Sequence, residues 1–340
     1  MSSTILVTGG AGYVGSHACK ALRAAGYEPV TYDNLCRGHR WAVQWGPLEE
    51  GDLADSARLR AVIERHRPAA VMHFAALAYA GESVGAPLAY YHTNLAGTLS
   101  LLEVMHACGV RDLVFSSSCA VYGLCALPKI PETAPCNPVS PYGFSKLGME
   151  RMIADCGTAW GLRAVALRYF NAAGADPDGT LGEAHDPETH LIPLVLQAAA
   201  GERQHIDVFG DDYPTPDGTC VRDYIHVADL ADAHVRALQR LPERGTSRAY
   251  NLGTGQGYSV KQVVDAARKI AGRPIRAEFR GRRAGDPPWA VAEATLAGRE
   301  LGWQPRFTSI EPILESAWRW MQQGAAAAQA RTSHLTARRT

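Results

Sequence analysis

The stretch VTGGAGYVGSH, residues 7–17, decides the fold. It follows the apolar run at 4–7, leads into a segment of helical character, and places Gly9, Gly12 and Gly15 in the turn between them. Glycine permits a tight turn and lets backbone N–H groups approach a pyrophosphate, which then faces the N-terminus of the helix. A glycine-rich turn alone is also compatible with ordinary turn chemistry, so the surrounding pattern has to decide.

Strands and helices are expected to alternate through the first half of the chain. The expected strands are 4–10, 28–33, 69–76, 112–118 and 163–171, and the expected helices are 14–26, 56–66, 93–109 and 140–161. Because these strands are apolar throughout, the pattern predicts an α/β fold of Rossmann type, a doubly wound parallel sheet covered by helices on both faces. Beyond Asn171 the chain is rich in Gly, Pro and Asp, which predicts long loops of functional character. Further helices are expected at 227–241, 259–272 and 309–323.

An acidic residue ends the second expected strand. Asp33 lies 18 residues after Gly15, where a carboxylate accepts hydrogen bonds from the adenosine ribose and repels a 2′-phosphate. This arrangement favours NAD over NADP, although Arg37 nearby leaves NADP open. Asp52 follows a short strand and is placed to meet the adenine edge, with a solvated loop aspartate as the alternative.

A tyrosine and a lysine lie four residues apart in SPYGFSKLGME, residues 140–150. On a helix, Tyr142 and Lys146 share a face. A free tyrosine has a pKa of about 10, and a nearby ammonium together with the positive nicotinamide favours the phenolate, which makes a base. A surface Tyr/Lys pair is the alternative. Ser118 closes an apolar strand at the carboxyl edge of the predicted sheet, where such folds bind ligands, and supplies a hydroxyl for the carbon being oxidised.

Composition excludes several classes of function. Thirty-four basic and 34 acidic residues give no net charge, so neither nucleic acid nor an anionic membrane is indicated as a partner. The eight cysteines are scattered without a CxxC pair, which predicts neither a zinc site nor a disulfide framework, and no metal is expected. The N-terminus shows no signal sequence and no apolar run is long enough to span a bilayer, so we expect a cytoplasmic protein.

Taken together, these motifs resemble the extended short-chain dehydrogenase/reductases, and within them the UDP-glucose (UDP-galactose) 4-epimerase family. The resemblance runs from about residue 4 to residue 320. It includes YDNL, GDL, HFAA, GESV, FSSSCAVYG, SPYGFSK, LRYFNAAGADP, DYPTPDGTCVRDYIHVADLADAH, YNLGTG and RRAGDPP.

The resemblance implies roles for individual residues. Tyr142 is expected to take the proton from the sugar 4-hydroxyl, Ser118 to bridge to the 4-oxygen, and Lys146 to hold the nicotinamide ribose. NAD is expected to take the hydride from C4, to return it to the other face of the keto sugar, and so to remain bound. The implied cofactor-binding residues are Gly9, Gly12, Tyr13, Val14, Gly15, Asp33, Asn34, Asp52, Leu53, Phe74, Ala75, Ala76, Asn94, Lys146 and Tyr169. The implied UDP-sugar-binding residues are Ser118, Tyr142, Asn171, His190, Leu191, Phe209, Arg222, Arg283, Asp286 and Ala290.

Four departures from the family pattern affect these expectations. Ala78 stands where many members have a lysine that contacts the cofactor, and Thr93-Asn94 replaces an Asn-Asn pair. His190 replaces an asparagine and is expected beside the diphosphate, with a surface histidine as the alternative. Ala290 aligns with the residue that limits bulk at the sugar C2, so UDP-GlcNAc and UDP-GalNAc are candidate substrates; a slip of one residue would put Trp289 there instead.

Several alternatives stay open. The stretch around Ala78 also resembles plant UDP-arabinose 4-epimerases, which leaves a UDP-pentose open. A nucleotide-sugar 4,6-dehydratase or decarboxylase shares the fold but places acids after the site serine, where this chain has Cys119 and Ala120. A non-catalytic NAD-sensing protein would tend to lose Tyr142 or Lys146. For Arg222, an ordinary loop ion pair with Asp223 is the alternative to diphosphate binding.

The domain organisation follows from the same resemblance. Residues 1–171 are expected to form the NAD-binding domain, with residues 222–252 returning to it. Residues 172–221 and 253–322 are expected to form the UDP-sugar lobe, and residues 323–340 a frayed tail. Apolar faces on the helices that begin near Asn94 and Tyr142 predict a homodimer.

Overall fold

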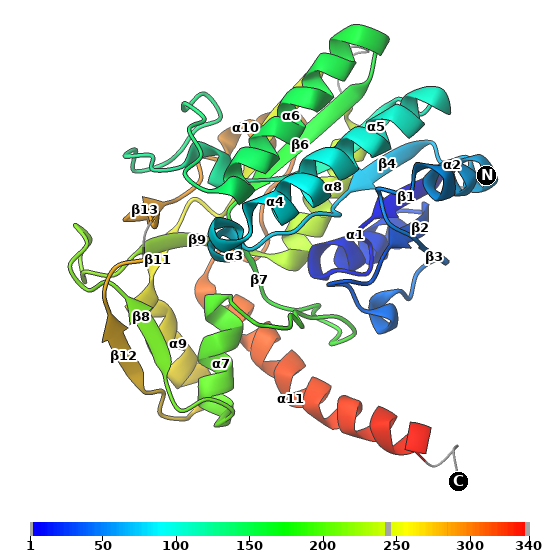
Figure 1. Cartoon of the computed structure of the whole chain (residues 1–340). Coiled ribbons are helices and arrows are strands. Elements are labelled where there is room, and N and C mark those ends of the chain that lie inside the picture. Colours follow the sequence, from blue (N-terminus) through cyan, green and yellow to red (C-terminus); the bar gives the residue numbers. More distant parts are fainter. Residues whose placement is uncertain (1–2, 242–245, 284, 337–340) are drawn as a thin grey trace.

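The structure, a computed structural model, describes residues 3–241, 246–283 and 285–336. Its largest element is a seven-stranded sheet in which every neighbouring pair is parallel (Figure 1). The strand order is β10-β6-β5-β4-β1-β2-β3. The strands are β1 (Thr4–Thr8), β2 (Glu28–Asp33), β3 (Leu48–Glu50), β4 (Ala70–His73), β5 (Asp112–Ser118), β6 (Arg163–Tyr169) and β10 (Ser247–Leu252). The predicted doubly wound, Rossmann-type sheet is confirmed.

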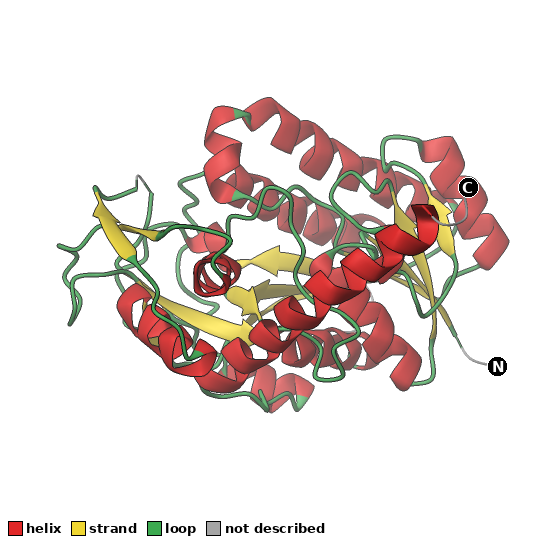
Figure 2. Ribbon diagram, turned by 90° about the horizontal axis from the view of Figure 1, so that it is seen from below, coloured by secondary structure: helices red, strands yellow, loops and turns green. Residues whose placement is uncertain are grey.

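Helices cover both faces of this sheet (Figure 2). On one face the core joins the strands to α1 (Tyr13–Ala24), α8 (Val227–Gln239) and α10 (Thr295–Leu301). On the other face it joins them to α2 (Ser56–His66), α5 (Gly97–Ala107) and α6 (Pro141–Trp160). The strand order reverses between β1 and β4, and ligands of such sheets bind at this switch point beyond the carboxyl ends of the strands.

A smaller lobe carries two further sheets. One has the order β11-β9-β13, with β7 also paired to β9, and the other pairs β12 with β8. Their strands are β7 (Asn171–Ala173), β8 (Ile206–Phe209), β9 (Val221–His226), β11 (Gly257–Ser259), β12 (Ala277–Arg280) and β13 (Trp289–Ala290). The core of this lobe packs the sheets against α7 (Leu191–Ala200), α9 (Val260–Ala271) and α11 (Ile310–Thr336).

The connection between β4 and α5 is helical rather than extended. It contains α3 (Ala80–Gly85), α4 (Pro87–Tyr90) and the π-helix η2 (Tyr91–Ala96), while η1 (Arg40–Ala42) and η3 (Cys119–Tyr122) are short 3₁₀ turns. Within residues 3–241, 246–283 and 285–336, no helix combines the length and apolar character that crossing a bilayer requires.

One expectation about the domains needs correction. Within the segment 222–252, α8 packs on the large sheet and β10 joins it, but β9 belongs to the smaller lobe, because it pairs with β7, β11 and β13. Helix α11 continues to Thr336, and the expected fraying of residues 323–336 stays a prediction. Residues 337–340 of that tail lie outside the described residues.

Candidate active site

A cavity of about 930 Å³ lies along the carboxyl ends of the large sheet and reaches the smaller lobe. Of the residues expected to bind the cofactor or the UDP-sugar, all except Asn94 and Lys146 line it. They are Gly9, Gly12, Tyr13, Val14, Gly15, Asp33, Asn34, Asp52, Leu53, Phe74, Ala75, Ala76, Ser118, Tyr142, Tyr169, Asn171, His190, Leu191, Phe209, Arg222, Arg283, Asp286 and Ala290. Their roles as ligand contacts stay predictions.

The glycine turn is tight, because the protein's own backbone leaves no room for a side chain at two of its glycines. Gly9 has a φ of +74°, and a Cβ at this position would lie 2.5 Å from the amide nitrogen of Ala75. A Cβ on Gly15 would lie 2.2 Å from the carbonyl oxygen of Gly9. Gly12 caps α1 without a side-chain hydrogen bond, so the first amides of the helix point toward the cavity without a capping acceptor. This geometry fits the pyrophosphate of a dinucleotide.

The acidic residues expected near the adenosine are held firmly. The Asp33 carboxylate accepts hydrogen bonds from the amides of Ala11, at 3.0 Å, and Leu35, at 2.8 Å. The Asp52 carboxylate accepts a hydrogen bond from Asn34 Nδ2 at 2.6 Å. Asp52 also lines the cavity, which the alternative of a solvated loop aspartate does not predict. Arg37, which left NADP open, lies 3.1 Å from the Glu82 carboxylate and donates to the Asp186 carbonyl, so its charge is already paired.

Ser118, Tyr142 and Lys146 come together where β5 ends and α6 begins. The Ser118 side chain accepts a hydrogen bond from Ala120 N at 3.1 Å, which fixes it at the sheet edge. Tyr142 lies in the first turn of α6, after the cap formed by Ser140. Lys146 lies one turn later; its Nζ donates to the Ser116 carbonyl at 2.8 Å and is 6.0 Å from the centre of the Tyr142 ring.

Burial controls the acid–base behaviour of this group. Desolvation raises the pKa of Tyr142 well above its ordinary value, Tyr169 raises it further, and the Ser118 hydroxyl acts in the opposite direction. Desolvation also lowers the pKa of Lys146 to about 7, against the opposing effect of Glu150. Among the protein's own groups, burial therefore dominates the pKa of Tyr142, and the lowering expected from Lys146 together with the nicotinamide charge stays a prediction.

Asn94 and Lys146 do not line the cavity, and their expected contacts with the cofactor stay predictions. The Asn94 side chain is fully buried; its oxygen accepts from the amide of Leu77 at 2.8 Å, and its Nδ2 donates to the Leu77 carbonyl and to Ser145 Oγ. Asn94 thus ties α6 to the segment that follows β4. Its position inside the π-helix η2 has a parallel in other proteins, where π-turns often occur at functional sites.

The opposite end of the cavity is positively charged. Arg222 lies 3.6 Å from Asp286 and donates to the Pro287 carbonyl, while Arg283 donates to Asp286 at 3.0 Å. The alternative of an Arg222–Asp223 ion pair is wrong, because the Asp223 carboxylate instead accepts from the amides of Thr254, Gly255 and Ala292.

The structure separates the two candidates for the residue at the sugar C2. Ala290 lines the cavity, whereas Trp289, the preceding residue of β13, does not appear among the residues lining it. Successive side chains of a strand point to opposite faces, so only one of the two can face the ligand. Phe209 also lines the cavity, with the Arg283 guanidinium 5.5 Å from its ring centre.

Among the cavity-lining residues that the sequence analysis missed are an acid and a histidine that lie side by side. Glu183 and His185 lie in the loop between β7 and α7 and line the cavity beside His190. His190 contacts the Glu183 carboxylate, but its side chain is 44% exposed, so the alternative of a surface histidine stays open. Burial lowers the pKa of His185, but the nearby carboxylates of Glu183 and Glu188 raise it to about 9. The spacing E-x-H-x-x-E-x-H within one loop was the available signal.

Comparisons with known proteins agree with this geometry. A model of the NAD dependent epimerase/dehydratase family matches residues 5–253. A UDP-glucose 4-epimerase of Rhizobium leguminosarum bv. trifolii is 52% identical over 317 residues, which cover 93% of this chain and 97% of that protein.

Solved structures are similar over nearly the whole chain. The UDP-glucose 4-epimerase from Brucella ovis in complex with NAD has a TM-score of 0.91 and 51% identity, covering 94% of this chain and 98% of that one. The UDP-glucose-4-epimerase from Stenotrophomonas maltophila, with NAD and formylated UDP-arabinopyranose, has a TM-score of 0.92 and 41% identity, covering 96% and 99%. These similarities confirm the resemblance drawn from the motifs. The chain belongs to the NAD dependent epimerase/dehydratase family.

Proposed function

We propose that the protein is a UDP-sugar 4-epimerase that interconverts UDP-glucose and UDP-galactose by transient oxidation at C4, with NAD retained as its cofactor. One observation carries the proposal. The Tyr142 phenol and the Ser118 hydroxyl line the same cavity as the glycine turn at one end and Arg222 and Arg283 at the other. A dinucleotide and a nucleoside diphosphate sugar can then meet at the tyrosine. The chain also covers nearly the full length of the UDP-glucose 4-epimerases it matches.

The residues divide the reaction among them. Bound NAD supplies a reversible hydride acceptor for the sugar C4. Tyr142 takes the proton of the 4-hydroxyl, and Ser118 holds the 4-oxygen by a hydrogen bond while C4 is a carbonyl. The keto sugar turns over within the cavity, and Tyr142 returns the proton when the hydride arrives on the other face. Because burial raises the pKa of Tyr142, proton removal depends on positive charge close to the phenol, and Lys146 supplies part of it.

The nucleotide end of the substrate has to be held in place, whereas the sugar end has to move. Arg222 and Arg283 are placed to hold a diphosphate by charge-assisted hydrogen bonds, which fixes the nucleotide. The sugar must stay free to rotate, and the small side chain of Ala290 leaves space beside it. This space supports N-acetylhexosamine nucleotides as additional substrates. A UDP-pentose remains the second candidate substrate, because the similar UDP-glucose-4-epimerase from Stenotrophomonas maltophila has formylated UDP-arabinopyranose bound.

The dehydratase alternative lacks a local acid–base group. The residue after Ser118 is Cys119, and burial raises the pKa of its thiol to about 12, so it stays neutral at pH 7. Ala120 follows it. Elimination of water from a keto sugar needs a proton donor and a base close to the reacting carbons, and neither residue supplies one.

An NMR time course tests the proposal. Purified protein without added NAD is given UDP-galactose, and we expect conversion to UDP-glucose. Tyr142→Phe should lower the rate by at least about 100-fold, because general-base catalysis contributes about 10²–10⁴-fold. Tyr91→Phe is the matched control, since Tyr91 does not line the cavity. Absence of conversion of UDP-galactose and of UDP-GalNAc, even with NAD supplied, would contradict the proposal.

We also propose a homodimer and a cytoplasmic location. Leu88 of α4, Leu99 of α5 and Phe144 of α6 are 69%, 49% and 53% exposed, and apolar side chains exposed on adjoining helices are typical of a subunit interface. All eight cysteines are free thiols, the usual state in a reducing compartment. Light scattering of the purified protein tests the dimer: Leu99→Glu with Phe144→Glu should shift it to the monomer mass, and an unchanged mass would contradict this interface.

A further inference from the structure

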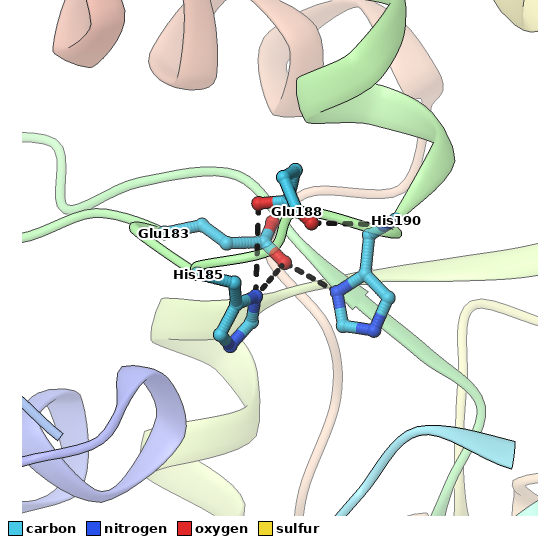
Figure 3. Close-up of side chains that lie close together, drawn as sticks. All are labelled: Glu183, His185, Glu188 and His190. Carbon is cyan, nitrogen blue, oxygen red and sulfur yellow. Dashed lines mark hydrogen bonds and ion pairs between the residues drawn. The ribbon is translucent and has the colours of Figure 1, made fainter. Parts of the chain in front are cut away.

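We propose that Glu183, His185, Glu188 and His190 form a binding site for one divalent transition-metal ion of the zinc type. All four side chains come from the loop before α7, and each offers one ligand atom, all of them within 4.8 Å of one another. Figure 3 shows the carboxylates and imidazoles converging on a common centre. No metal was expected from the sequence, where only the cysteine spacing was considered.

The distances suit an ion of this size. His185 Nδ1 is 3.1 Å from a Glu183 oxygen and 3.7 Å from a Glu188 oxygen, and His190 Nδ1 contacts the same Glu183 oxygen (Figure 3). Ligand atoms at about 2.0–2.2 Å from a tetrahedral zinc ion are about 3.3–3.6 Å apart. Small side-chain adjustments therefore bring the set to metal geometry. Two imidazole nitrogens with two carboxylate oxygens favour zinc, cobalt or nickel over magnesium or calcium.

The charges in the cluster call for a cation. The side chains of Glu183 and Glu188 are only 6% and 8% exposed. Within the described residues, no lysine or arginine makes an ion pair with either of them; their partners are the two histidines. Buried carboxylates need a compensating charge. Protonated histidines supply this charge in the ion-free protein, and a divalent ion that displaces their protons supplies it in the bound form.

The surroundings already orient the ligands. One Glu188 oxygen accepts hydrogen bonds from the amides of Thr189 and His190 at 2.7 and 2.8 Å, which leaves the other facing His185. The Tyr79 ring packs edge-on against both imidazoles, with centroid distances of 5.6 and 6.0 Å. His185 Nδ1 is buried and has no hydrogen bond of regular geometry within the described residues, although it points at the carboxylates. Supporting contacts of this kind are typical of metal sites.

A second group of similar composition provides a control. His205, Asp207 and Glu278 also lie close together. There, however, Arg280 pairs with Asp207 at 2.8 Å and with Glu278 at 2.6 Å, so arginine already balances the carboxylates. The two clusters therefore differ in one feature: an arginine, which no metal ion can replace, pairs with the carboxylates of the second cluster, whereas only histidines pair with those of the first.

Titration with Co²⁺ tests the site directly. NAD-containing protein is dialysed against a chelator, then titrated while visible absorption and bound metal are measured. We expect one Co²⁺ per chain with the absorption of a four-coordinate ion, displaced by Zn²⁺. His185→Asn and Glu183→Gln should each weaken binding by at least about 10-fold, since even residues supporting metal ligands contribute about 10–100-fold. His205→Asn should bind as the unaltered protein does.

Two outcomes would overturn the inference: no stoichiometric binding to the NAD-containing protein, or binding that is unchanged in both His185→Asn and Glu183→Gln. Circular dichroism of each variant shows that it is folded, so a loss of binding is not a loss of structure. The readout is metal bound rather than sugar converted. An active epimerase that binds no metal therefore removes this inference and leaves the proposed function intact.

Discussion

At the scale of single residues, burial decides how the expected site works. The sequence indicates that Tyr142 and Lys146 share a helix face and that Ser118 ends a strand, and the structure places all three where β5 meets α6. The direction of the tyrosine pKa was not predictable from spacing, because it depends on how much solvent each side chain loses. That quantity is set by side chains packed from elsewhere, such as Tyr90 and Tyr169.

The residue at the sugar C2 yields a prediction about specificity. Ala290→Tyr fills the space beside the sugar, so kcat/KM for UDP-GalNAc should fall at least about 10-fold more than that for UDP-galactose, in line with the effect of misfitting bulk in a shaped pocket. Trp289→Phe is the matched control and should leave the ratio of the two values unchanged. Parallel assays on both substrates give this ratio. An equal effect of Ala290→Tyr on both would place Ala290 away from C2.

At the scale of helices and strands, the predicted bounds agree most closely with the structure where the sequence pattern depends on neighbouring residues. The strands at 28–33 and 112–118 and the helix at 56–66 have the expected bounds, because apolar runs and helical periodicity are read from neighbouring residues. Helix α7, whose sequence is LIPLVLQAAA, was not expected, since it is apolar all round, contains Pro193 and follows a long loop. The π-turn that positions Asn94 also has no sequence signature of its own.

The glycine turn yields a prediction about cofactor retention. Gly15→Ala adds a Cβ that would lie 2.2 Å from the Gly9 carbonyl, so the turn must open and the purified protein should lose most of its bound NAD. Gly85→Ala is the control, because a Cβ there meets nothing within 4 Å and its φ is not positive. Nucleotide released by denaturing equal amounts of each protein measures retention. Full NAD content in Gly15→Ala would show that this turn does not contact the cofactor.

At the scale of the whole molecule, the sheets of the smaller lobe could not be predicted from the sequence. Its sheet joins β7, β9, β11 and β13, which lie far apart in the chain, and several of these strands have only two or three residues. Such pairings depend on how the large sheet brings distant segments of the chain together rather than on the β-propensity of each segment. The alternation of strands and helices, in contrast, predicted a parallel sheet with helices on both faces, although not the order of its strands.

Buried histidines make the stability of the whole fold sensitive to pH. Desolvation lowers the pKa values of His73 and His226 to about 3 and those of His17 and His234 to about 4, against about 6.5 in the unfolded chain. At these four positions the unfolded state therefore binds more protons below pH 6.5, so their contribution to stability is full above this pH and is lost as the pH falls. Each histidine contributes a slope of about 1.4 kcal/mol per pH unit between its two pKa values.

Urea unfolding at pH 8, 6.5 and 5 measures this effect. We expect little change between the first two and a steep loss of free energy of unfolding at the third. His73→Gln should lower the slope of the free energy of unfolding against pH by about 1.4 kcal/mol per pH unit, because it removes one of the titrating groups. Equal stability at pH 6.5 and 5 would show that these histidines are already protonated in the folded protein.

In the proposed reaction, one hydride leaves C4 and returns to it within a single closed site. UDP-glucose carrying deuterium at C4, incubated with the purified protein without added NAD, measures this most directly. The account predicts UDP-galactose that keeps its deuterium at C4, with none lost to water or to free NADH. Replacement of the label by solvent hydrogen, or its appearance in released NADH, would contradict it.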